Sequence, residues 1–160
     1  MRRILLDTNV LVDYYLGRQP GCDACCRLVE RVGDSLALYV ASLSLKDCYY
    51  HITMSLKRAS RADDGTLSPE SAQAAAEVGW ACVRQALDFV QVLPVGQEEC
   101  LQALVYRPLH NDFEDDLVLA AGLLAKVDFV VTSDERLQRH APFACLAPQD
   151  MVKFLEAESS

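Results

Sequence analysis

Two apolar runs of this 160-residue chain each lead into an aspartate. Asp7 follows the run at 4–6, and Asp134 follows the run at 129–133. Short apolar runs between polar residues are typical of buried parallel strands, and open α/β sheets place their chemistry just beyond the carboxyl ends of such strands. We therefore expect both carboxylates to lie at one edge of a sheet.

A third group of acids, Asp-Phe-Glu-Asp-Asp at 112–116, opens a predicted helix between them in sequence. Two carboxylates about 4 Å apart repel by roughly 4 kcal/mol at an effective dielectric constant near 20. A hard divalent cation is the usual remedy in proteins. The carboxylates therefore predict a cation site, provided that this helix begins beside the same edge of the sheet.

Strands and helices alternate along the chain. The predicted strands are 3–6, 36–40, 90–93, 128–132 and a short 143–146. The predicted helices are 10–16, 22–31, 42 or 44 to about 60, 68–87, 97–106, 112–126 and 148–156, with a polar linker at 58–66. This alternation predicts the α/β class, as a three-layer α/β/α domain with a mainly parallel central sheet. We expect one domain over 1–157 and a tail at 158–160.

Composition restricts the class of protein. Hydrophobic residues make up 51% of the chain, while Gly and Pro are few, which indicates an ordered globular domain. No apolar stretch reaches 18 residues and Met-Arg-Arg leads directly into a strand, so we expect a cytoplasmic protein without membrane association. The net charge of −8 argues against a dedicated nucleic-acid binder. It permits an enzyme that reaches phosphates through bound cations.

The seven cysteines do not indicate a disulfide framework. Their number is odd, and they are spread over predicted helices and a strand, so reduced thiols are expected. Cys22, Cys25 and Cys26 recur at helical spacing without a second Cys or His pair at zinc spacing. They are interpreted as small apolar side chains of a helix.

Several acids have a simpler interpretation. An isolated aspartate is most often a helix cap or a solvated loop residue, and Asp112 is expected to cap the helix that it opens. Asp116 is the alternative ligand if the helix register differs by one residue, and Asp13 is expected at the surface. The histidines, His51, His110 and His140, share no spacing and are interpreted as non-catalytic.

Four segments resemble the PIN-domain family in order and spacing. They are Leu-Asp-Thr-Asn at 6–9, Ser-x-Ser-x-x-Asp-x-Tyr-Tyr at 42–50, Asp-Phe-Glu-Asp-Asp-Leu at 112–117 and Thr-Ser-Asp at 132–134, followed by Leu-x-Pro-x-Asp-Met at 146–151. The resemblance spans the whole chain. It implies a PIN-like fold and a ribonuclease that depends on Mg²⁺ or Mn²⁺.

The resemblance also assigns site residues. Asp7, Asp115 and Asp134 match the metal-binding acids of the family, and Asp47 stands where many relatives have a glutamate and near relatives have asparagine. These four are the expected catalytic residues. Asn9 and Thr132 are expected to orient the acids, as residues behind a metal site do. Ser133 stands where the family has arginine, which removes a cation from the edge of the site.

The chemistry of phosphodiester cleavage fits these residue types, because the attacking water must lose a proton and charge on the phosphate oxygens must be neutralised. An aspartate-nucleophile phosphohydrolase would need an acid two residues after Asp7, where Asn9 stands. The resemblance implies an RNA-cleaving toxin of the VapC-like type, a homodimer through helices 47–60 and 68–87, and an antitoxin partner. The alternative is a catalytically weakened PIN-like module that binds another protein.

Overall fold

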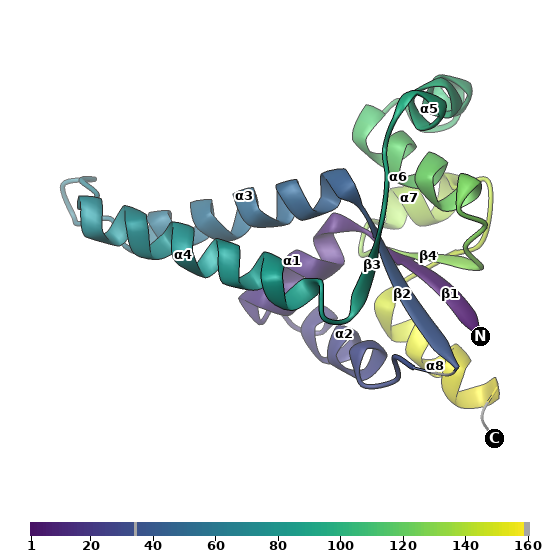
Figure 1. Ribbon diagram of the computed structural model, residues 1–160, viewed down its shortest axis with the longest axis horizontal. Helices are drawn as coiled ribbons and strands as arrows, with labels where there is room; N and C mark the ends of the chain where they lie inside the picture. Colours follow the sequence, from purple (N-terminus) through teal and green to yellow (C-terminus); the bar gives the residue numbers. More distant parts are fainter. Residues whose placement is uncertain (34, 159–160) are drawn as a thin grey trace.

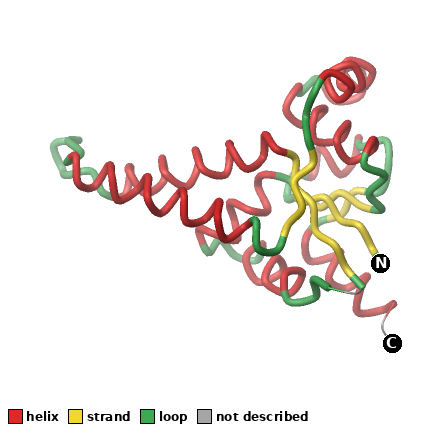
Figure 2. The backbone as a smooth tube through the Cα atoms, in the orientation of Figure 1, coloured by secondary structure: helices red, strands yellow, loops and turns green. Residues whose placement is uncertain are grey.

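The computed structural model describes residues 1–33 and 35–158, and over these residues it forms a five-stranded parallel sheet flanked by helices (Figures 1 and 2). The strand order is β3-β2-β1-β4-β5. The strands are β1 (Arg2–Leu6), β2 (Leu36–Ala41), β3 (Val90–Leu93), β4 (Phe129–Val131) and β5 (Cys145–Leu146). The helices are α1 (Thr8–Leu16), α2 (Gly21–Val29), α3 (Ser42–Ala59), α4 (Pro69–Ala86), α5 (Gln97–His110), α6 (Phe113–Leu124), α7 (Glu135–His140) and α8 (Pro148–Glu158). The predicted α/β architecture is confirmed.

The three inner strands, β2, β1 and β4, are largely buried, which explains why they form continuous apolar runs in the sequence. Ile4 and Leu6 of β1 point into a core formed with helices α1, α2, α3 and α8. Leu5 points the other way, into a core formed with α5, α6 and α7. Successive side chains of a strand alternate between faces, so one five-residue strand supports both helical layers.

Strands β1 and β4 are neighbours in the sheet, so their carboxyl ends lie together. Leu6 lies in register with Val131, and the Asp7 N–H donates to the Val131 carbonyl oxygen at 2.9 Å. The residue after β1 and the residues after β4 are therefore neighbours at the carboxyl edge of the sheet, although more than 120 positions separate them in the sequence.

A long antiparallel hairpin of α3 and α4 projects away from the sheet (Figure 1). Ser68 caps α4 by accepting from the Ser71 N–H at 3.1 Å. The two helices approach closely at Gly79, where an added Cβ would lie 2.6 Å from Thr53 Cγ2 and 2.9 Å from the Tyr49 ring. The apolar faces of α3 and α4 are thus largely used against each other and against the core.

Some predicted boundaries are wrong. Helix α7 is absent from the sequence-based scheme because six residues are too few to display a helical period, and the cap that starts it is Asp134. Helix α5 runs past residue 106 to His110 and ends at Asn111 in the left-handed conformation. Helix α3 reaches Ala59 and α4 begins at Pro69, so the linker lies at 60–68 and not at 58–66. Helix α8 includes Glu158, and residues 159–160 of the expected tail lie outside the described residues.

The seven cysteines are free thiols in the described structure. Cys25 is buried, while Cys22 and Cys26 beside it on α2 are half-buried. No helix within the described part of the chain combines the length and the apolar character needed to cross a membrane.

Candidate active site

Asp7 lies between β1 and α1 and is 4% exposed. It caps α1, because its Oδ1 accepts from the Thr8 N–H at 2.7 Å. Its Oδ2 accepts from Asn9 Nδ2 at 2.7 Å and from the Thr132 hydroxyl at 2.6 Å. Burial raises the pKa of Asp7 and the nearby Asp134 adds to this, while the hydrogen bonds from Thr132, Thr8 and Asn9 oppose it. The carboxylate is therefore held in one orientation in a poorly solvated place.

Thr132 joins the two strand ends. Its Oγ1 accepts from Asn9 Nδ2 at 2.9 Å and from the Asp134 N–H at 3.0 Å, so its single proton is directed to Asp7. Asn9 also accepts the Ser133 N–H through Oδ1 at 2.9 Å. The structure thus places Asn9 and Thr132 directly behind the carboxylates, where they can orient them.

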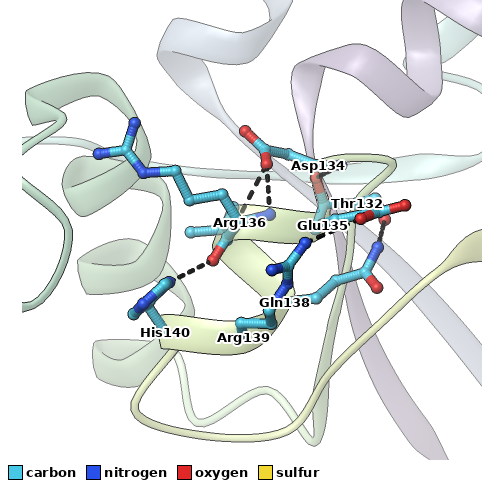
Figure 3. A network of polar contacts seen from close by, with 8 residues as sticks. Thr132, Asp134, Glu135, Arg136, Gln138, Arg139 and His140 are labelled. Carbon is cyan, nitrogen blue, oxygen red and sulfur yellow. Dashed lines mark hydrogen bonds and ion pairs between the residues drawn. The ribbon is translucent and has the colours of Figure 1, made fainter.

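Asp134 begins α7. Its Oδ1 accepts from the Arg136 N–H at 2.7 Å and from the Leu137 N–H at 3.3 Å (Figure 3). Gln138 reaches back from the same helix and donates to the main-chain oxygen of Thr132 at 2.8 Å (Figure 3). The short helix therefore fixes the direction in which β4 ends.

Helix α6 brings its acids to the same place. Asp112 caps the helix by accepting from the Glu114 and Asp115 N–H groups, as expected. Burial raises the pKa of Asp115 to about 7, and the carboxylates of Asp7, Asp112 and Asp134 add to this effect. The pKa of the exposed Glu114 is also raised, first by desolvation and then by Asp47 and Asp7. Negative charge is concentrated here.

An open pocket of about 310 Å³ lies among these groups. Its lining residues are Asp7, Thr8, Asn9, Val12, Asp13, Arg18, His51, Asp112, Glu114, Asp115 and Asp134. We call it the acidic pocket. It contains all three expected metal ligands. Asp116 is 2% exposed and lines a different hollow between α5 and α6, so the helix register favours Asp115.

Asp47 does not line the acidic pocket. Its side chain is 13% exposed and pairs with Lys46 Nζ at 2.5 Å. It lies close enough to Glu114 to raise the pKa of that residue. Asp47 therefore stands at the margin of the site, farther from the centre than the other three expected catalytic acids.

Among the polar lining residues, Asp13, His51 and Glu114 had no functional role in the sequence-based interpretation. Asp13 lies four residues after Asn9 and therefore on the same face of α1, which is a signal that could have revealed it. Arg18 and His51 come from a loop and from another helix, and nothing in their spacing indicates the pocket. His140 is exposed on α7, and the side chain of His110 lies outside the described part of the structure.

Within the described residues, no group of three or more His, Cys, Asp or Glu side chains is already arranged around a metal position. Asp7, Asp112 and Asp134 each use a carboxylate oxygen to cap a helix. The donor set nevertheless fits Mg²⁺ or Mn²⁺, because it consists of carboxylate oxygens, and Mg²⁺ binds through one or two carboxylates while it keeps several waters. Burial and the neighbouring carboxylates raise the pKa of Asp115, and a cation bound beside it would favour its ionised form.

Comparison with known proteins gives one family. The model of the PIN domain family matches residues 3–136. A search of curated protein sequences gives no match. Among solved structures, FitAcB from Neisseria gonorrhoeae superimposes with a TM-score of 0.65 at 14% identity, covering 91% of this chain and 98% of that one.

Two further structures are similar. A toxin–antitoxin complex from Klebsiella pneumoniae has a TM-score of 0.60 at 16% identity, covering 91% of this chain and 97% of that one. VapC20 from Mycobacterium tuberculosis, described as a toxin that cleaves the sarcin–ricin loop, has a TM-score of 0.60 at 16% identity, covering 88% and 96%. At these identities the likeness shows the fold.

Proposed function

Because this chain belongs to the PIN domain family, a family of nucleases, we propose that it is a Mg²⁺- or Mn²⁺-dependent endoribonuclease. The observation that carries the proposal is the meeting of Asp7, Asp115 and Asp134 in one open pocket at the carboxyl ends of the central strands. Hydrolysis of single-stranded RNA by the purified protein, dependent on added Mg²⁺ or Mn²⁺ and stopped by EDTA, tests it directly.

The residues in and behind the acidic pocket would have different roles in the reaction. Asp7, Asp115 and Asp134 would hold the cation, which when bound activates water and neutralises charge on the phosphate oxygens. Thr132 and Asn9 keep the Asp7 carboxylate aimed into the pocket through hydrogen bonds of 2.6 and 2.7 Å. Asp47, at the margin of the acidic pocket, would position substrate groups that approach the pocket beside Glu114.

The proposed cellular role is the toxin of a toxin–antitoxin pair. The similarity to a chain of the Klebsiella pneumoniae toxin–antitoxin complex supports this role. An inhibitor of this protein would place an Arg or Lys among Asp7, Asp115 and Asp134, because a buried acidic cluster favours charge-assisted hydrogen bonds with a cation.

The alternative is a PIN-like module that binds a protein and no longer cleaves RNA. It is favoured by Ser133, whose hydroxyl donates to Asp13 at 3.4 Å and which is uncharged where the family has arginine. Retention of all three central acids opposes it, because carboxylates that repel one another have a cost without a cation. Absence of cleavage at every metal concentration would favour this alternative.

Metal binding is expected to stabilise the folded protein. At a Mn²⁺ concentration of 100 times Kd, binding to the native state contributes about 2.7 kcal/mol and raises Tm by roughly 5–10 °C. Differential scanning calorimetry measures this shift, and Asp115→Asn should remove most of it. An equal shift for wild type and for Asp115→Asn would place the ion elsewhere and contradict the assigned ligands.

We also propose a homodimer. The exposed apolar residues of the α3–α4 hairpin, Tyr50, Val78 and Trp80, do not fall on one helix face. Helix α5 instead exposes a continuous stripe, which consists of Leu101, Leu104, Val105 and Leu109, with Phe113 just beyond it. The resemblance implied the hairpin, but the exposed apolar residues of α5 follow one helix face, so we place the centre of the dimer there.

Light scattering of the wild type is expected to give the mass of two chains. Leu104→Glu should give a monomer, because it buries an unpaired charge in the contact, and Trp80→Glu should remain a dimer. The reverse result would return the interface to the hairpin. A wild-type protein that is monomeric at micromolar concentration would refute the dimer.

A further inference from the structure

Arg18 is the single Lys or Arg among the described residues that line the acidic pocket. The pocket otherwise presents the carboxylates of Asp7, Asp13, Asp112, Glu114, Asp115 and Asp134. A phosphodiester entering such a place is repelled by every one of these groups. A fixed cation at the rim would therefore have a large influence on where the phosphate backbone of a substrate can lie.

The end of α1 fixes the backbone of Arg18. Gly17 adopts the left-handed conformation with φ of 65°, which lets the chain turn so that the Gly17 and Arg18 N–H groups both donate to the Asp13 carbonyl oxygen. The same helix is capped at its start by Asp7. Nine helical residues, about 13 Å, thus connect the central acid to the loop that carries Arg18.

The side chain of Arg18 turns back toward the pocket and is anchored by Asp13. Its Nη1 lies 3.8 Å from Asp13 Oδ1. Asp13 is itself held from two sides, because Ser133 donates to its Oδ2 and α2 begins against it at Gly21. A Cβ at Gly21 would lie 2.8 Å from Asp13 Oδ2, so this close approach depends on glycine.

The pair between Arg18 and Asp13 contributes little to stability. The Arg18 side chain is 58% exposed and the separation is long, and ion pairs of this kind are worth about 0–1 kcal/mol. The guanidinium therefore lies beside Asp13 while the Arg18 side chain stays largely open to solvent. Arg18 can therefore bind an anionic ligand without losing a strong contact within the protein.

Asp13 also lies at the boundary between the acidic pocket and a second hollow. A second hollow of about 630 Å³ lies on its other side, lined by Asp13 and Ser133 together with Gln19, Gln138 and Gln149. The two hollows share Asp13. A strand that leaves the central carboxylates toward the second hollow must cross Asp13, beside the guanidinium of Arg18.

We propose that Arg18 contacts a backbone phosphate of the RNA strand next to the phosphodiester that is cut, and that it thereby positions the substrate; this inference rests on the proposed ribonuclease function. The planar guanidinium binds phosphate oxygens through paired N–H groups, and it is always charged. Arg18 supplies this cation from the loop between α1 and α2.

The test uses the Asp115→Asn protein, which should bind RNA without cutting it, with Mg²⁺ and a fluorescent single-stranded oligoribonucleotide. Adding Arg18→Gln should weaken binding about fivefold and reduce the slope of log K against log salt concentration by about 0.7, the value for one phosphate contact on a single strand. Adding Arg18→Lys should keep the slope. In the wild-type background, Arg18→Gln should raise KM and leave kcat unchanged.

Arg27→Gln is the matched control. Arg27 is 63% exposed, pairs with Glu156 at 3.7 Å and lies on α2, outside the residues that line the acidic pocket. Equal RNA affinity for the Arg18→Gln and Arg27→Gln proteins would overturn the role of Arg18, and cleavage by the wild type would then leave the ribonuclease function standing. If the wild type neither binds nor cleaves RNA, both proposals fall.

Discussion

Asp115→Asn is expected to lower the rate of RNA cleavage by roughly 10²–10³-fold, the size of effect seen when one charge-stabilising group is removed from an active site. Asparagine keeps the shape of the side chain and removes the negative charge. Asp115 lies in the pocket with Asp7 and Asp134, and burial and these neighbours raise its pKa, so its charge is held there at a cost in stability. The variant should therefore fold as well as the wild type or slightly better.

Asp7→Asn should also abolish cleavage, but with a different effect on the fold. The Asp7 carboxylate accepts three hydrogen bonds, from Thr8, Asn9 and Thr132. Asparagine has one acceptor oxygen, so its NH₂ group would face a donor and destabilise the protein by about 1–3 kcal/mol. Asp115→Asn is for this reason the cleaner test of catalysis.

Single-turnover assays with a labelled RNA at several Mn²⁺ concentrations measure the loss. Asp88→Asn, a change of an exposed aspartate after α4, serves as the control and should cleave at the wild-type rate. Wild-type rates for Asp115→Asn in preparations free of contaminating nuclease would exclude Asp115 from the active site. Equal cleavage by all three variants would point to a contaminating nuclease, and an equal loss in all three, Asp88→Asn included, would point to misfolding.

The metal-free protein is expected to become less stable as pH rises from about 4 to about 7. The pKa of Asp115 is about 7 in the folded state against an ordinary value of 3.8, so between these values the folded state binds more protons than the unfolded state. Stability then falls with increasing pH. At roughly 1.4 kcal/mol per unit, and with allowance for solvent screening of a half-exposed group, the loss is about 2 kcal/mol. The raised pKa of Asp7 acts in the same direction.

Urea unfolding in EDTA at pH 4.5, 6 and 7.5 measures this dependence. Asp115→Asn should flatten most of it, because the neutral amide does not titrate. Saturating Mg²⁺ at pH 7.5 should restore the lost stability to the wild type, since a cation favours the ionised carboxylate. A wild-type protein whose stability rises between pH 4.5 and 7.5 in EDTA would show that the acids are not clustered as described.

The fold class could be predicted from the sequence, because parallel strands that are buried on both faces appear as short continuous runs of apolar residues. The fully buried strand at Leu36–Ala41 was predicted to within one residue, and the order of strands and helices defined the three layers. Membership of the PIN domain family was predicted from motifs that are local in the chain, and the match to the family model confirms it. Features that depend on neighbours in sequence were therefore predictable.

The sequence also indicated that Asp7 and Asp134 lie at one edge of the sheet, since each comes soon after one of two neighbouring parallel strands. It left open whether Asp115 or Asp116 faces the pocket, because a helix offers both positions and only packing against α5 turns Asp116 away. It overlooked α7, which is too short for a periodic signal and depends on the cap from Asp134. Asp47 was expected to be catalytic but was not counted among the metal ligands, and its side chain pairs with Lys46 outside the lining of the acidic pocket.

Arg18 and His51 reach the acidic pocket through tertiary structure, whereas the spacing of Asp13 from Asn9 on α1 was a signal in the sequence. Arg18 is brought there by the left-handed turn at Gly17 and by an ion pair across that turn, and His51 by the packing of α3 against α1. Contacts between elements distant in sequence depend on the angles at which helices cross the sheet, and these angles are set by the volumes of all the packed side chains together. The sequence determined the strands and the acids at their ends, while packing decided that the guanidinium of Arg18 lies beside those acids.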